Sequence, residues 1–190
     1  MLLVIMVAGI ACASTSYALS TDRDKDLNVT ARYQKSQLGN KVGSEANTTV
    51  LTGDVNIDQG SLKAHGDEAH LYDVPSKTGK DDGSKRIVLT GKPAHMQQQL
   101  DNDGGLMTAD ANKIDYNTGT NIAELTGNVV VIQQGNSEFR GEHMTYNSNT
   151  GAMEGGSQSP GSQVRLKFLP KNKSTPATKP ANKPADGKSG

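Results

Sequence analysis

Apolar and polar residues alternate along several stretches in the middle of the chain. Val129 and Val131 alternate with polar or opposite-facing positions, and Val55 and Ile57 do the same earlier in the sequence. Alternation with a period of two is typical of a β-strand that buries one face. Glycine-containing turns separate these stretches, so the pattern predicts an all-β chain.

The alternating stretches belong to a sequence repeat. Three segments open with Leu-Thr-Gly and close with Thr-Gly: Leu51–Gly79, Leu89–Gly119 and Leu125–Gly151. Their starts, at positions 51, 89 and 125, are 38 and then 36 residues apart. A period of this size indicates supersecondary units that cannot bury an apolar face alone and must stack on one another.

The alternation changes phase inside each repeat. Ala64 to Ala69 is an odd step, and so is Phe139 to Met144, with a Gly-acid pair between the two apolar positions each time. An odd step turns later side chains to the opposite face of a straight strand. The chain must therefore bend or bulge at this pair if all these residues face one core. Each repeat is predicted as strand, turn, strand, corner, strand and turn.

Stacked repeats of this kind predict a jelly-roll-like or solenoid-like stack of antiparallel strands. Its two facing sheets would enclose a continuous apolar slot, unevenly filled because Ala64 in one copy corresponds to Phe139 in another. Such a slot could admit a guest molecule. An irregularly packed core explains the same residues equally well.

Both ends of the stack are predicted to carry unpaired strands. Residues 27–37 resemble half a repeat, and residues 164–170 read as a final strand. Neither end resembles a polar cap, so each is an aggregation risk unless another chain pairs with it. The candidate docking residues on these edge strands are Leu27, Val29, Val164, Leu166 and Phe168.

The two termini differ from the repeats. Residues 1–18 combine a short apolar run with small residues and predict a signal peptide cleaved after Ala18, which would remove Cys12, the single cysteine. The run is shorter than the roughly 20 residues that span a bilayer. Residues 170–190 are rich in Lys, Pro and Ala without apolar periodicity, and predict a disordered tail.

Charge and motif content exclude several function classes. The 20 Lys and Arg balance the 20 Asp and Glu, which gives no basic field for nucleic acid. His65 and His70 fall in outward polar columns, and the loop beginning at Asp101 has Asn112 where a calcium loop needs a bidentate Glu. No nucleophile elbow or phosphate-binding loop is present. We expect no metal site, no cofactor and no enzyme activity.

The repeat resembles a known family. Its Leu-Thr-Gly-Asn-Val strand, Gln-Gly turn, Gly-Glu or Gly-Asp corner and Tyr-Asn-x-x-Thr-Gly ending are similar to the OstA-like repeat of periplasmic lipopolysaccharide-transport proteins, with the domain over residues 19–169. The resemblance implies an open, twisted β-jelly-roll in the periplasm of a Gram-negative bacterium. It also implies head-to-tail joining to itself and to related domains at the inner and outer membranes, which forms a bridge for lipopolysaccharide.

On this interpretation the slot shields the acyl chains of lipid A, because each methylene kept from water contributes about 0.8 kcal/mol. The predicted lining is Val55, Ile57, Leu62, Ala64, Leu71, Ile114, Ile122, Val129, Val131, Phe139, Met144 and Tyr146.

Two other classes remain open. A structural β-filament or adhesin would share the open edges without needing an apolar slot. A β-solenoid carbohydrate-active enzyme would place carboxylates along a groove, whereas Asp67, Asp110 and Glu142 fall at predicted corners.

Overall fold

The computed structural model describes residues 20–38, 47–74, 83–101, 104–156 and 163–168. The predicted signal peptide at 1–18 and the predicted tail at 170–190 lie outside these residues. A short 3-10 helix, η1 (Ser20–Asp24), precedes the strands. No helix in the described part of the chain is long and apolar enough to cross a membrane.

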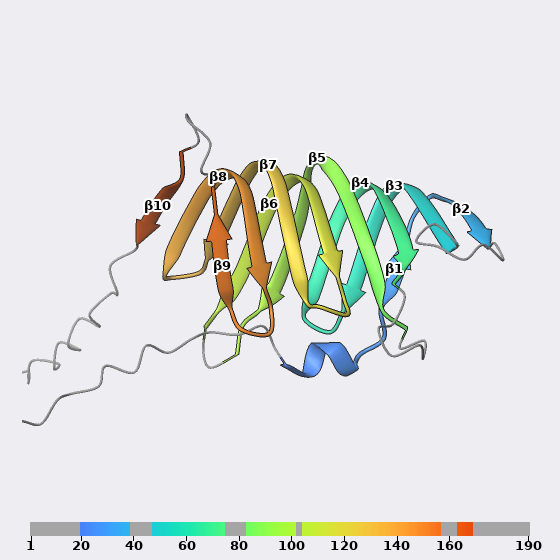
Figure 1. Ribbon diagram of the computed structural model, residues 1–190, viewed down its shortest axis with the longest axis horizontal. Coiled ribbons are helices and arrows are strands. Elements are labelled where there is room, and N and C mark those ends of the chain that lie inside the picture. The colour runs from blue at the N-terminus through green and yellow to red at the C-terminus, as the bar shows by residue number, and fades with distance from the viewer. Residues whose placement is uncertain (1–19, 39–46, 75–82, 102–103, 157–162, 169–190) are drawn as a thin grey trace, which may run out of the picture.

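The strands form one antiparallel sheet with ten members, in the order β1-β3-β4-β5-β6-β7-β8-β10, with β2 beside β3 and β9 beside β8 (Figure 1). Within the described residues no pairing joins the two ends, so the sheet is open. The strands are β1 (Asn28–Thr30), β2 (Tyr33–Leu38), β3 (Asn47–Gln59), β4 (Leu62–Asp73), β5 (Lys85–Gln99), β6 (Leu106–Asn117), β7 (Ile122–Gln133), β8 (Ser137–Asn147), β9 (Ala152–Gly155) and β10 (Arg165–Phe168).

Each long strand bends near its middle, where the register with its neighbours shifts. The bends divide the sheet into two half-sheets. We call one the β1–β10 half, because β1 pairs with residues 56–58 of β3 and β10 with residues 137–140 of β8. The other is the β2–β9 half, because β2 pairs with residues 47–52 of β3 and β9 with residues 144–147 of β8. The bent strands arch along the top of Figure 1.

The first and third Leu-Thr-Gly motifs create the bends of β3 and β7. Gly53 and Asp54 have φ values of 78° and 53°, and Gly127 and Asn128 have 79° and 51°. Two successive residues in the left-handed region insert an extra residue into the strand, and Asp and Asn tolerate this region better than most side chains. The motif was expected to start a strand but lies in the middle of β3 and β7, because these residues bend the strand without ending it.

The second copy bends by other means. The register of β5 shifts between Thr90 and His95 against β4 and between Thr90 and Ala94 against β6, across a cis Lys92-Pro93 bond. Pro93 therefore occupies a bulge in the interior of the sheet, where its missing N–H removes no ladder hydrogen bond.

The predicted odd step is confirmed in β4 and β8. Gly66 is buried and faces inward, and the next inward residue is Ala69. In β8 the corresponding step runs from Gly141 to Met144. The bend thus keeps one face of a single sheet turned inward on both sides of the corner.

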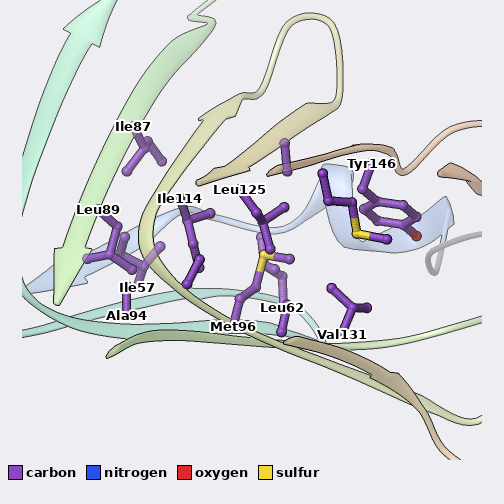
Figure 2. Close-up of a cluster of buried hydrophobic side chains, with 14 of the residues drawn as sticks. Ile57, Leu62, Ile87, Leu89, Ala94, Met96, Ile114, Leu125, Val131 and Tyr146 are labelled. Carbon is purple, nitrogen blue, oxygen red and sulfur yellow. The ribbon is translucent and has the colours of Figure 1, made fainter. Parts of the chain in front are cut away.

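The core lies between the half-sheets. Figure 2 shows Ile87, Leu89, Ile114, Leu125 and Tyr146 facing Ile57, Leu62, Ala94, Met96 and Val131. All ten of these residues are buried. Side chains of the β2–β9 half thus pack on side chains of the β1–β10 half.

A substitution at the bend tests its role. In Gly127→Ala the new Cβ would lie 2.6 Å from Asn112 Nδ2 at a φ of +79°. Gly135→Ala, in a turn with a φ of +72° and no atom within 4 Å, is the matched control. The left-handed conformation should lower the free energy of unfolding of both by about 1–2 kcal/mol. The contact should make the loss larger in Gly127→Ala, measured by urea unfolding. Equal losses would show that the bend is not closely packed.

Candidate functional site: an apolar slot between the half-sheets

The slot is the space between the inner faces of the two half-sheets. Directly opposed residues in a ladder share a face, so the strand register defines rows of side chains that run across the strands. One inner row of the β1–β10 half is apolar throughout: Val29, Ile57, Ala64, Met96, Ala109, Val131, Phe139 and Leu166. A row of the β2–β9 half opposes it with Leu51, Ala69, Leu89, Ile114, Leu125 and Met144.

The structure brings together eleven of the twelve predicted lining residues. Nine are buried in the core, and Ala64 and Leu71 are partly buried against it. Ile122 is the exception, because it alternates with the buried Ala123 and Leu125 and so lies on the outer face of β7.

Several slot residues were missed by the sequence analysis. Leu51, Leu89 and Leu125 are buried with exposed fractions of 5%, 2% and 1%. They are the leucines of the three Leu-Thr-Gly motifs, so the repeat contained the signal that would have found them. The predicted lining omits them because the motif opens each repeat in the sequence, away from the alternating positions that define the lining.

The slot is filled by its own side chains. A cavity of about 20 Å³ remains among Ile57, Leu62, Ile87, Leu89 and Met96. That volume suits a single water molecule, but an apolar lining offers water no hydrogen-bond partners. An acyl chain can enter only if the half-sheets separate.

The mouth of the slot lies on the side opposite the bends, where the hairpin turns gather. The η1 helix lies beneath these turns (Figure 1). Its Asp22 is 6% exposed and accepts hydrogen bonds from Ser61 N at 2.8 Å, Ser61 Oγ at 2.5 Å and Gln98 Nε2 at 3.2 Å. Asp22 thereby fixes η1 to the turn between β3 and β4 and to the end of β5.

The two ends of the slot are open. On β10, Leu166 is 62% exposed and Phe168 is 73% exposed. Their ladder partners are Phe139 and Ser137, so both side chains are on the inner face. At the other end, Leu27 and Val29 are partly buried against the core. Val164 precedes β10 and is 38% exposed.

One hydroxyl inside the slot has no partner. Tyr146 is 3% exposed, and its OH makes no hydrogen bond with the described residues. Burial raises the pKa of Tyr146 to about 12, with a smaller contribution from Tyr116, so the hydroxyl stays protonated at neutral pH. A buried donor without a partner costs on the order of 1–3 kcal/mol.

Charged residues lie mainly on the outer faces. Arg86 donates two hydrogen bonds to Asp115, from Nε at 2.8 Å and from Nη2 at 2.6 Å. His65 Nδ1 lies 3.2 Å from Asn56 Oδ1, and His70 Nε2 lies 2.7 Å from Glu68 Oε1. Among the described residues no three His, Cys, Asp or Glu side chains gather as metal ligands.

The corner carboxylates do not form a groove-lining pair. Asp67 and Glu142 are exposed at the bends of β4 and β8. Asp110 Oδ1 lies 2.7 Å from His95 Nδ1 on the outer face of the β1–β10 half. These positions match the predicted corners and give no arrangement for paired acid and base catalysis.

The fold and slot define an open β-jelly-roll whose apolar interior reaches both ends. The family described as "LptA/(LptD N-terminal domain) LPS transport protein" matches residues 39–152. The chain therefore belongs to this family of lipopolysaccharide-transport proteins.

Individual lipopolysaccharide export proteins are also similar to this chain. The lipopolysaccharide export system protein LptH of Pseudomonas aeruginosa PAO1 is 31% identical over 152 residues, covering 80% of this chain and 79% of LptH. Lipopolysaccharide export system protein LptA of Escherichia coli K12 is 27% identical over 144 residues, covering 76% of this chain and 71% of LptA.

A solved structure is also similar. The crystal structure of LptH, described as the periplasmic component of the lipopolysaccharide transport device, superposes with a TM-score of 0.62 at 25% identity. The superposition covers 79% of this chain and 99% of that one. The predicted fold class, an open twisted β-jelly-roll of antiparallel strands, is confirmed.

The buried Tyr146 makes stability depend on alkaline pH. The pKa of Tyr146 is higher in the folded chain than in the unfolded chain. The resulting contribution to the free energy of unfolding is complete below pH 10 and is lost as pH rises through about 12. Between pH 9 and pH 11.5 the free energy of unfolding of Tyr146→Phe, measured with urea, should fall by on the order of 2 kcal/mol less than that of the unmodified chain. Tyr33→Phe, at a tyrosine that is 62% exposed, should follow the unmodified chain. Parallel pH profiles for all three would contradict the burial of the hydroxyl.

Proposed function

We propose that the chain is a periplasmic carrier that binds lipopolysaccharide in the slot and passes it from the inner toward the outer membrane. The observation that carries the proposal is the apolar row from Val29 to Leu166, which crosses the whole sheet. An acyl stretch of ten carbons left in water would cost roughly 8 kcal/mol, so a lipid crossing an aqueous compartment needs such a cover. The sugars would remain outside the slot.

The filled slot implies that the lipid opens it. The strand pairs with extensive backbone contact are ladder neighbours, so the half-sheets are joined through the bends and are otherwise held together by side-chain packing. Acyl chains that enter from the mouth would replace contacts such as Leu89 on Ile57 with equally apolar contacts. The bends would serve as the hinge, because each strand continues through them from one half-sheet to the other.

Strand direction supports head-to-tail assembly. All pairings are antiparallel, so β9 and β10 run opposite to β1 and β2. When one molecule is translated along the long axis, its β1 meets β10 of the next in an antiparallel sense, and β2 meets β9 likewise. Such pairing satisfies the exposed edges of both molecules.

The slot would continue through this junction. Leu166 and Phe168 face inward on β10, and Val29 faces inward on β1. Strand pairing would bring them side by side and remove from water the side chains that a single molecule exposes. A lipid could then pass from one molecule to the next without leaving apolar surroundings.

The partners in this proposal are lipopolysaccharide, further copies of the chain, and inner- and outer-membrane transport proteins with related β domains. The protein itself is not an enzyme, so a partner supplies the energy for directed movement. Residues 1–18 would direct export and be removed, and residues 170–190 would form a disordered tail beyond the domain at 19–169.

Photo-crosslinking tests the slot. A photoreactive residue at Ile57, Phe139 or Tyr146 should label lipopolysaccharide, whereas the same residue at the outward-facing His70 should not. In a separate pull-down, the chain from residue 19 onward should retain lipopolysaccharide. Increasing amounts of unlabelled lipopolysaccharide should compete with this binding. Equal labelling inside and outside would contradict the slot assignment. Absence of binding by the folded chain would favour the structural filament.

Substitution of the open end tests assembly. Leu166→Asp with Phe168→Asp should weaken self-association by at least tenfold, because a carboxylate cannot be buried at the junction without a partner. Ile132→Asp is the control, since Ile132 is an apolar side chain on the outer face of β7 and is 39% exposed. Sedimentation over a concentration series gives the association constants. Equal self-association of the two variants would exclude β10 from the junction.

A further inference from the structure

Two unpartnered polar atoms belong to residues on neighbouring rows of the β2–β9 half, toward the mouth of the slot. One is the Tyr146 hydroxyl, and the other is Asn121 Oδ1; both are buried without a hydrogen-bond partner among the described residues. The exposed fractions of the two residues are 3% and 6%. No other side-chain atom in the described part of the chain shares this condition.

Strand register places the two residues beside each other. Tyr146 pairs with Ala123, and Asn121 continues the same register opposite Ser148, whose N–H donates to Asn121 O at 2.9 Å. Asn121 therefore lies one row nearer the mouth than Tyr146. Two residues along a strand correspond to roughly 7 Å between Cα atoms.

The inward polar groups Gln98 and Gln133, which lie toward the mouth on the β1–β10 half, have partners. Gln98 donates to Asp22, and Gln133 Nε2 donates to Gly104 O at 3.1 Å. The buried contacts of η1 are with Ser61 and Gln98, on the first strands of the sheet rather than on β7 and β8. On the facing β2–β9 half, Tyr146 and Asn121 thus keep polar atoms that are left for a guest.

The two atoms have complementary chemistry. A phenol hydroxyl that remains protonated donates to a carbonyl oxygen, and an amide oxygen accepts from an N–H or O–H group. Unpaired buried groups of this kind are destabilising in the empty protein and become favourable when a ligand completes them. A purely apolar chain would complete neither.

We propose that Tyr146 and Asn121 recognise the polar linkage at the head of a lipid's acyl chains, an amide or ester carbonyl together with an N–H or O–H donor. The inference rests on the proposed function, because it specifies which part of the lipid this end of the slot binds. It makes the two residues selective for acylated sugars over lipids that join sugar and alkyl chain through a glycosidic oxygen.

Two probes with equal chains test the proposal. N-dodecanoylglucosamine carries an amide, and dodecyl glucoside carries the same number of chain carbons on a glycosidic oxygen. Each is titrated against the chain from residue 19 onward, loaded with a fluorescent dodecanoic acid derivative, and displacement gives the affinity. Tyr146→Phe should weaken amide-probe binding roughly 3- to 10-fold, the value of one hydrogen bond, and leave glucoside binding unchanged.

Asn121→Gly provides a second variant that keeps the backbone, because Asn121 has a φ of 58° that glycine adopts freely. It should also weaken amide-probe binding selectively. Tyr33→Phe, on the outer face, should change neither affinity. In the absence of lipid, Tyr146→Phe should melt at a higher temperature than the unmodified chain. A hydroxyl with a merely structural role would not give both a higher melting temperature and weaker binding of the amide probe.

The outcomes separate the two proposals. If the unmodified chain binds lipopolysaccharide and both probes, but Tyr146→Phe and Asn121→Gly bind the amide probe as tightly as it does, the recognition role is wrong and the carrier function stands. If the unmodified chain binds neither probe nor lipopolysaccharide, both proposals fall. Selective loss in either variant supports the recognition role.

Discussion

The bend in the middle of every long strand is the constraint on which this structure depends. A straight antiparallel sheet of this sequence would leave one apolar face in water, because the described part of the chain has no helix longer than η1 to cover it. The bend folds the sheet over so that one half covers the other. Two successive left-handed residues, Gly53-Asp54 and Gly127-Asn128, achieve this in β3 and β7 without interrupting the ladder.

A core made in this way has no natural end. In a closed barrel the last strand pairs with the first, whereas here β10 and β1 each present a free edge. The inner row simply stops at Leu166 on one side and Val29 on the other. Exposure of Phe168 is a consequence of this geometry, because its side chain points toward a slot that no further strand of the described residues closes.

The same geometry separates strong from weak contacts. Ladder hydrogen bonds act along each half-sheet, while only side chains such as Leu89 and Met96 meet across the slot. Small buried residues, among them Ala69 and Ala94, are part of this side-chain contact. Opening the slot would therefore disturb apolar contacts and leave the ladders intact. An unpaired hydroxyl at Tyr146 adds to the destabilisation of the closed form.

The strands, the stacked repeats and the presence of a corner can all be predicted from the amino-acid sequence. Period-two alternation and the odd step from Ala64 to Ala69 are local features, and local features follow from backbone geometry. Eleven of the twelve predicted lining residues face the slot for this reason. Ile122 does not, because a one-residue error next to a turn moves a side chain to the opposite face.

Features that depend on contacts between distant segments of the chain are visible only in the folded structure. The sequence does not show that Leu-Thr-Gly bends a strand rather than starting one, because the register shift involves both neighbours. It does not show that Asp22 would be fixed by Ser61 and Gln98, 39 and 76 residues away. The missing partner of Tyr146 is likewise a property of the packed slot, since hydrogen bonding across a fold is set by which strands meet.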